Sequence, residues 1–309
     1  MIEFKNVKLN LKHIDILNNI SFKAMKNTVT CIVGNRNAGK SSVLKLIAGI
    51  YKDYYGEILI DGKELYENQN IKINMIHDTI ENDPNVTVVE YLEFYGKMYG
   101  DLTNEEISLY IDNQLKSFAL MSYKYTTLDN LDKETYKLID MIRALMNDPD
   151  ILLFDNLFFS DNIDYNEKVL NFVKNFVGRK TIIFVARNLN FVEGICDNIG
   201  VLDYGQLVAY GKKEEVYKKA ELITKVEMRI IGDAASVINI LQNDERVINV
   251  VYENDNIVFS INPEIEAKYK NELREIEADI LKNIISAGIK VSSYRKQQAQ
   301  FEQLLGRLT

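Results

Sequence analysis

Apolar and polar residues alternate along the first two thirds of the chain in a way that predicts strands followed by amphipathic helices. Apolar runs of strand length, typical of buried strands, occur at 28–33, 151–154 and 181–186. Further strands are predicted at 2–4, 7–11, 14–22, 56–62, 71–76, 199–203 and 206–210. Helices are predicted at 42–48, 87–99, 104–115, 136–145, 167–176 and 190–196. This alternation predicts an α/β fold, a largely parallel sheet with helices packed on it.

A charged stretch at about 211–221 separates this pattern from a second, smaller one. Beyond it, strands are predicted at 226–231, 247–252, 257–261 and 289–291, and helices at 234–241, 264–286 and 299–308. The length of 309 residues also suits two domains. We therefore predict a domain of residues 1–215, with a mostly helical insert at about 86–145, and a small α+β domain of residues 216–309.

The string GNRNAGKS, Gly34–Ser41, fits the phosphate-binding pattern G-x-x-x-x-G-K-[ST]. An apolar strand pattern precedes it and a helical pattern follows it, which is the context that this motif needs. In such a loop backbone N–H groups surround the phosphates, the lysine reaches the β/γ-phosphates and the serine hydroxyl holds Mg²⁺. The predicted nucleotide-binding residues are Gly34, Asn35, Asn37, Ala38, Gly39, Lys40, Ser41 and Ser42.

Asp155 ends the apolar run at 151–154 and is the predicted second Mg²⁺ residue, acting through water. Taken alone this pattern is weak, because many buried strands end in aspartate. Together with the phosphate-binding loop and the preceding segment 143–150, it becomes specific. The predicted cofactors are therefore ATP and Mg²⁺, with Ser41 and Asp155 at the metal.

Composition restricts the partners and the compartment. A net charge of −8 argues against a sequence-independent nucleic-acid binder, which would need a basic face. No apolar run approaches the roughly 20 residues that cross a bilayer, and the N-terminus lacks a signal-peptide pattern, so we expect membrane association only through a partner. The two cysteines, Cys31 and Cys196, are predicted to be buried free thiols, as expected in the cytosol.

The chain resembles the ATP-binding subunits of ABC transporters over nearly all its length. Residues 143–155, RALMNDPDILLFD, are similar to that family's passage from a helix into the Walker B strand. The segments 57–65, 87–100 and 196–211 resemble further family segments, and 301–309 resembles the C-terminus of exporters of drugs and antimicrobial peptides. The resemblance implies an ABC-type P-loop NTPase domain that dimerises head to tail. Each ATP then lies between the P-loop of one domain and the signature loop of the other.

Several positions on the nucleotide face depart from the family pattern. The family's glutamate, which polarises the attacking water, corresponds to Asn156, and its γ-phosphate histidine corresponds to Arg187. The only histidines, His13 and His77, both precede Asp155, so no later histidine exists. The remaining departures are Leu11 for the adenine-stacking aromatic, Asp78 for the Q-loop glutamine, Leu131–Thr135 (LDKET) for the signature LSGGQ, and Asn162 for the D-loop aspartate.

These departures predict a subunit that binds Mg-ATP and hydrolyses it poorly, with no intact catalytic residue. An amide at Asn156 cannot accept a proton from water. The charges of Asp132 and Glu134 replace the serine and glycine that would approach a partner's γ-phosphate. Asp78 is a possible further Mg²⁺ residue. Arg187 either places a positive charge at the γ-phosphate or lies on the surface.

The resemblance also implies the partners. We predict a heterodimer with a second ATPase subunit, bound to a polytopic membrane permease at the inner face of the cell membrane. Export of peptides or drugs is favoured. Two other interpretations remain open: a fully active transport ATPase with unusual motifs, and a regulatory or scaffold protein of the same superfamily.

Overall fold

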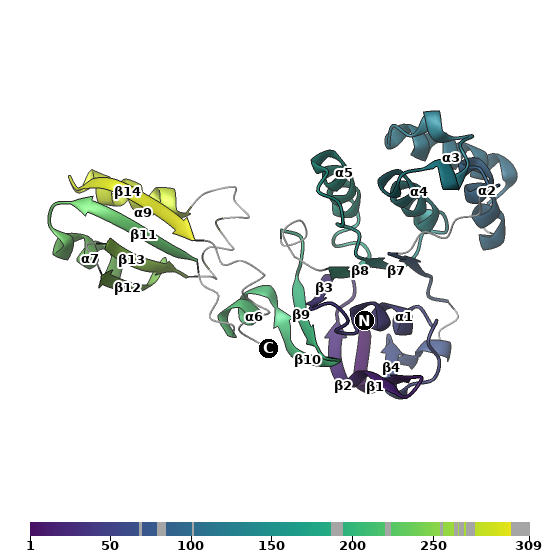
Figure 1. The fold of residues 1–309 in the computed structure, drawn as a ribbon, viewed down its shortest axis with the longest axis horizontal. Helices are drawn as coiled ribbons and strands as arrows, with labels where there is room; N and C mark the ends of the chain where they lie inside the picture. The colour runs from purple at the N-terminus through teal and green to yellow at the C-terminus, as the bar shows by residue number, and fades with distance from the viewer. Residues whose placement is uncertain are drawn as a thin grey trace. The chain divides into compact units, whose positions relative to one another are not determined.

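The computed structural model describes residues 1–67, 70–78, 85–100, 102–186, 194–219, 224–253, 256–262, 265, 269 and 276–297. The chain divides into two compact units, Met1–Tyr210 and Gly211–Thr309 (Figure 1). This division lies just before the boundary at 215/216 that the sequence predicted. The helix predicted at 299–308 lies outside the described residues, as do 190–193 and most of 264–275.

A six-stranded sheet forms the centre of the first unit, in the order β10-β9-β3-β8-β7-β6. The strands are β3 (Val29–Gly34), β6 (Ile73–Ile76), β7 (Ile151–Asp155), β8 (Thr181–Ala186), β9 (Asn198–Asp203) and β10 (Gln206–Lys212). The pairs β3–β8, β3–β9, β6–β7 and β7–β8 are parallel, which confirms the predicted α/β fold. The carboxyl ends of parallel strands meet at one edge, so residues that follow β3, β6 and β7 come together there.

A second, antiparallel sheet has the order β2-β1-β4-β5. Its strands are β1 (Ile2–Leu11), β2 (Ile14–Ala24), β4 (Tyr55–Ile60) and β5 (Lys63–Glu64), followed by the 3-10 turn η1 (Leu65–Glu67). The prediction of two short strands at 2–4 and 7–11 was wrong. They form one strand whose register shifts after Phe4, where Asn6 adopts a left-handed φ of 50°.

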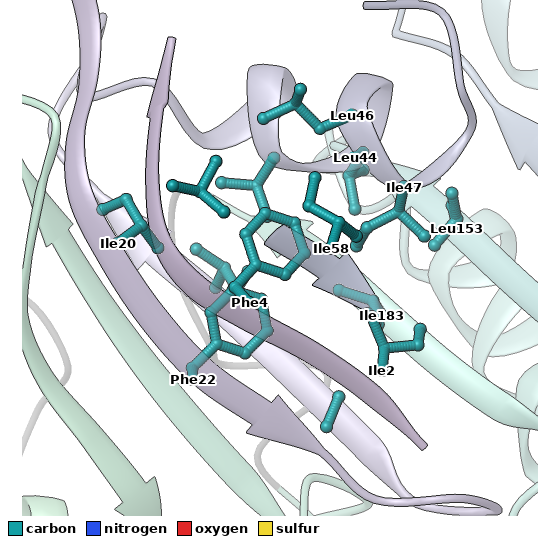
Figure 2. Close-up of a cluster of buried hydrophobic side chains, with 14 of the residues drawn as sticks. Ile2, Phe4, Ile20, Phe22, Leu44, Leu46, Ile47, Ile58, Leu153 and Ile183 are labelled. Atoms are coloured by element: carbon teal, nitrogen blue, oxygen red, sulfur yellow. The ribbon is translucent and has the colours of Figure 1, made fainter. Parts of the chain in front are cut away.

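One hydrophobic core joins both sheets to helix α1 (Lys40–Ile47) (Figure 2). The rings of Phe4 and Phe22 stack with their centroids 4.6 Å apart. Ile47 of α1 and Ile183 of the parallel sheet belong to the same buried cluster. Because residues of both sheets pack in one core with α1, the position of the loop that precedes α1 is fixed.

The insert consists mainly of α2 (Val88–Tyr99), α3 (Asn104–Ser117) and α4 (Lys133–Leu145), with short 3-10 turns η2 (Met121–Tyr123) and η3 (Leu128–Asn130). Thr87 and Thr103 form capping boxes that fix the starts of α2 and α3. Helix α4 begins earlier than the predicted 136, because the Asp132 carboxylate accepts a hydrogen bond from the backbone N–H of Thr135 at 2.8 Å.

Helix α5 (Ile163–Lys174) also begins before its predicted start at 167, because Asn162 caps it. Of the helix predicted at 190–196, the described part, 194–196, is not helical. Within the described part of the chain, no helix combines the length and apolarity needed to cross a membrane.

The second unit follows a β-α-β-β-α-β order that gives a ferredoxin-like sheet, β12-β13-β11-β14. After α6 (Lys213–Lys219), its elements are β11 (Lys225–Ile231), α7 (Ala234–Gln242), β12 (Val247–Glu253), β13 (Asn256–Ile261), α9 (Ile276–Ser286) and β14 (Lys290–Gln297). Alternate residues of β11, including Val226 and Met228, are buried against α7 and α9. Strand β14 extends well past the predicted 289–291.

Candidate functional site

The loop Gly34–Ser41 connects the buried strand β3 to α1, and both of its glycines are required by close approach. A Cβ atom on Gly34 would lie 1.9 Å from the carbonyl oxygen of Leu202. Gly39 adopts φ 96°, and a Cβ there would lie 2.7 Å from Leu17 Cδ2. The glycine spacing is therefore a steric property of this loop as well as a sequence pattern.

Lys40 braces the loop from inside. Its ammonium donates hydrogen bonds to the carbonyl oxygens of Gly34 (2.7 Å) and Asn35 (2.6 Å). The Asn35 side-chain amide donates to Asp203 Oδ1 at 3.2 Å, which ties the loop to the end of β9. The backbone N–H groups at the start of α1 and the lysine charge both favour an anion, so the arrangement suits the phosphates of a nucleotide.

The Ser41 hydroxyl and the Asp155 carboxylate meet at the carboxyl edge of the sheet. Ser41 Oγ donates to Asp155 Oδ1 at 2.9 Å. Burial raises the pKa of Asp155, the hydrogen bond from Ser41 opposes that rise, and the nearby Asp78 carboxylate adds to it. Two carboxylates beside a hydroxyl are the oxygen donors that Mg²⁺ prefers when phosphates and water complete its shell. The residues present therefore fit Mg²⁺ bound together with a nucleotide.

Asn156, directly after Asp155, already has a partner. It adopts a left-handed φ of 52°, a conformation that asparagine tolerates well. Its side-chain amide donates to Asp78 Oδ1 at 3.3 Å. Asp78 follows β6, so this bond joins the ends of two neighbouring strands.

The segment Leu131–Thr135 contacts the same region of its own chain. The Lys133 ammonium lies 3.2 Å from Asp78 Oδ1 and 4.3 Å from the centroid of the Phe159 ring. Glu134 accepts hydrogen bonds from the Ser160 hydroxyl and, at 2.8 Å, from the side-chain amide of Asn162. The Asp132 carboxylate caps α4. Lys133 and Asn156 thus share the Asp78 carboxylate, and Glu134 separately binds Ser160 and Asn162.

Two predicted positions remain without further support. Leu11 is half-buried at the end of β1 and packs against the hydrophobic core. Arg187 lies outside the described residues, so its proposed contact with a γ-phosphate stays a prediction.

Sequence reasoning missed Lys137 and His77. Lys137 of α4 is fully buried, and among the described residues its ammonium has no hydrogen-bond partner. His77 lies close enough for its charge to favour the ionised form of Asp155. The spacing of Lys133 and Lys137, four residues apart on one helix, was a signal available in the sequence. The free thiols Cys31 and Cys196, distant in sequence, are neighbours in space, and burial raises the pKa of Cys31.

Replacing Lys137 by methionine is expected to raise the free energy of unfolding by about 1–3 kcal/mol at neutral pH, because it removes an unsatisfied buried charge. Burial lowers the pKa of Lys137, so its charge costs stability where the lysine is protonated in both states. The gain should therefore shrink as pH rises toward the unfolded-state pKa of about 10.4. Chemical denaturation at several pH values tests this, with exposed Lys116→Met as the control. Loss of stability in Lys137→Met would show that the surrounding carboxylates outweigh burial.

The part of the chain that carries this site is similar to a known protein family. Residues 17–158 match the family model described as "ABC transporter". Residues 17–158 form an ABC transporter ATP-binding domain. The P-loop and the Ser41–Asp155 pair lie within these residues, and domains of this family bind ATP with Mg²⁺ as the usual partner.

Individual relatives extend this likeness. The uncharacterised ABC transporter ATP-binding protein MJ1023 of Methanocaldococcus jannaschii is 29% identical over 211 residues, covering 67% of this chain and 76% of that protein. The linearmycin resistance ATP-binding protein LnrL of Bacillus subtilis is 24% identical and covers 100% of this chain and 98% of its own. The dimeric structure of MJ0796, a bacterial ABC transporter cassette, has a TM-score of 0.63 at 24% identity. It covers 69% of this chain and 98% of its own.

Proposed function

We propose that this chain is the ATP-binding subunit of an ABC transporter and that its own nucleotide site retains Mg-ATP rather than hydrolysing it quickly. The main support is Asn156, whose amide donates to Asp78. By the resemblance to the family, a general base would stand at this position. An amide can orient water but cannot take up its proton. Binding and hydrolysis are therefore separated at this site.

The binding part of the proposal rests on the loop and its partners. Lys40 and the N-terminus of α1 would hold the phosphates, as their donors and charge favour. Ser41 and Asp155 would hold Mg²⁺, which neutralises charge on the β- and γ-phosphates when bound. None of these groups requires a carboxylate at position 156.

The subunit would act in a heterodimer with a second ATPase and transmit closure to a polytopic permease at the inner face of the membrane. In a homodimer both composite sites would combine Asn156 with the segment Leu131–Thr135, and neither would turn over well. A partner with an intact signature would let this P-loop clamp ATP. The competent P-loop of that partner would face Asp132 and Glu134 of this chain. The carboxylates of both residues already accept hydrogen bonds within this chain.

Export of a drug or an antimicrobial peptide is the direction we propose. The support is the linearmycin resistance protein, whose similarity extends over the second unit as well as the ATP-binding domain. Co-purification with a polytopic membrane protein would favour the transporter, whereas a chain without such a partner would favour a regulatory or scaffold role.

Replacing Asn156 by glutamate is expected to raise the ATPase rate by about tenfold to 100-fold over a slow wild type, because it supplies the missing base. The gain stays at or below the lower limit of the usual range of about 100- to 10,000-fold, since glutamate tolerates φ 52° less well than asparagine and Leu131–Thr135 is unchanged. Steady-state phosphate release measures it. Asn156→Gln, which adds the same length without a carboxylate, is the control and should stay slow. Rapid wild-type turnover that disappears in Lys40→Ala would instead support the fully active ATPase.

A further inference from the structure

Lys133 holds the first turn of α4 against the nucleotide side of the domain. Its ammonium is 3.2 Å from Asp78 Oδ1, and the ring of Phe159 lies beneath it. Asp78 also accepts the amide of Asn156, so one carboxylate connects the insert with the end of β7. Both members of the Lys133–Asp78 pair remain partly exposed, and their attraction is correspondingly modest.

Lys137 adds a second positive charge one turn further along α4. It is fully buried, and in the described part of the chain no acceptor meets its ammonium. The carboxylates of Asp140, Asp78 and Asp155 favour its charged form, whereas the Lys133 charge opposes it. Burial outweighs this help, so the Lys137 charge is held at a cost.

The carboxylates of Asp78 and Asp155 also lie near each other. Asp155 is buried, and Asp78 lies near enough to disfavour its ionised form. Two neighbouring carboxylates require positive charge, and α4 supplies it through side chains of the same chain. These are also the carboxylates that we expect to bind Mg²⁺, directly or through water.

We propose that Lys133 acts as a built-in counter-ion for Asp78, and that Mg²⁺ arriving with ATP competes with it, releasing Lys133 from Asp78. A divalent ion at these carboxylates repels both ammonium groups and removes the acceptor that Lys133 uses. Metal-nucleotide binding and the Lys133–Asp78 attachment of α4 are then mutually exclusive. This inference rests on the proposed ATP site and adds its regulation by the insert.

The test compares the affinity of the full-length chain for ATP in EDTA and in MgCl2 by titration calorimetry. The ratio of the two affinities is the magnesium gain. Lys133→Met should increase the magnesium gain by about two- to fivefold, the value of an exposed ion pair. Asp78→Asn should reduce it, and Lys133→Met should have no further effect in the Asp78→Asn background.

The matched control is Lys97→Met, which breaks the exposed Lys97–Glu93 pair on α2 (3.3 Å) and should leave the magnesium gain unchanged. Thermal unfolding of each variant without nucleotide shows whether it is folded. Hydrogen exchange in the first turn of α4 provides an independent readout. In the wild type it should rise with Mg-ATP and not with ATP in EDTA.

Three results would overturn the inference: an unchanged gain in Lys133→Met, an equal increase in the Asp78→Asn background, or weaker ATP binding by Lys133→Met in EDTA. The last result would mean that Lys133 contacts the nucleotide itself. If wild type binds no ATP in either buffer, the proposed ATP site is wrong and the inference falls with it. Binding in EDTA with any of the three results refutes only the counter-ion role.

Discussion

Replacing Lys40 by alanine is expected to weaken ATP binding by about 30- to 1,000-fold. The ammonium of Lys40 points into the loop and donates to two of its carbonyl oxygens, so the same group is placed to meet bound phosphates. Loss of one partner of a buried charged pair costs about 2–4 kcal/mol, which corresponds to this factor. Titration calorimetry of the full-length chain with ATP and MgCl2 measures the change.

Two comparisons keep the Lys40→Ala result interpretable. Lys63→Ala removes an exposed lysine from β5 and should leave ATP affinity unaltered. The thermal unfolding midpoint without nucleotide should be similar in both variants, which separates loss of binding from loss of structure. Wild-type affinity in Lys40→Ala would mean that ATP does not use this loop.

Replacing Lys296 by methionine is expected to destabilise the second unit by about 3 kcal/mol. The Lys296 ammonium on β14 is paired with the carboxylate of Glu277 on α9. Glu277 is only 3% exposed. The other carboxylate oxygen of Glu277 has no hydrogen-bond partner among the described residues. Without the lysine, a buried negative charge would have no compensation.

The Lys296→Met effect should be confined to the unit that carries the pair. Hydrogen exchange should accelerate in the core of that unit, including Val226 and Phe259, and stay unchanged in β3 of the ATP-binding domain. The exposed Lys290→Met, on the same strand, is the control. Adding Glu277→Gln should restore part of the loss. A fully stable single variant would show that Glu277 is solvated or otherwise paired.

The sequence predicted the parallel sheet and the phosphate-binding loop because both depend on local patterns. The runs at 28–33, 151–154 and 181–186 became buried strands, and glycine spacing identified a turn that sterics require. The start of α4 was predicted too late in the chain. Asp132 was compared with the serine of the family signature and was not considered as a helix cap.

The hydrogen bonds that Asp78 makes with Lys133 and Asn156 could not be predicted from the sequence. Asp78, Lys133 and Asn156 lie far apart along the chain and meet only because β6 and β7 are neighbours and α4 packs against β6. Pair contacts of this kind depend on tertiary geometry, and no local pattern signals them. The spacing of Lys133 and Lys137 places both lysines on one face of a helix, but it does not reveal that this face is covered at Lys137.

The central claim is that this chain binds Mg-ATP and does not turn it over efficiently by itself. The most direct test incubates the purified full-length chain with Mg-ATP, then identifies the retained nucleotide and counts released phosphate. The account predicts intact ATP on the protein and less phosphate than protein, with retention lost in Lys40→Ala. Many phosphates released per chain, with ADP bound and Lys40→Ala inactive, would contradict it.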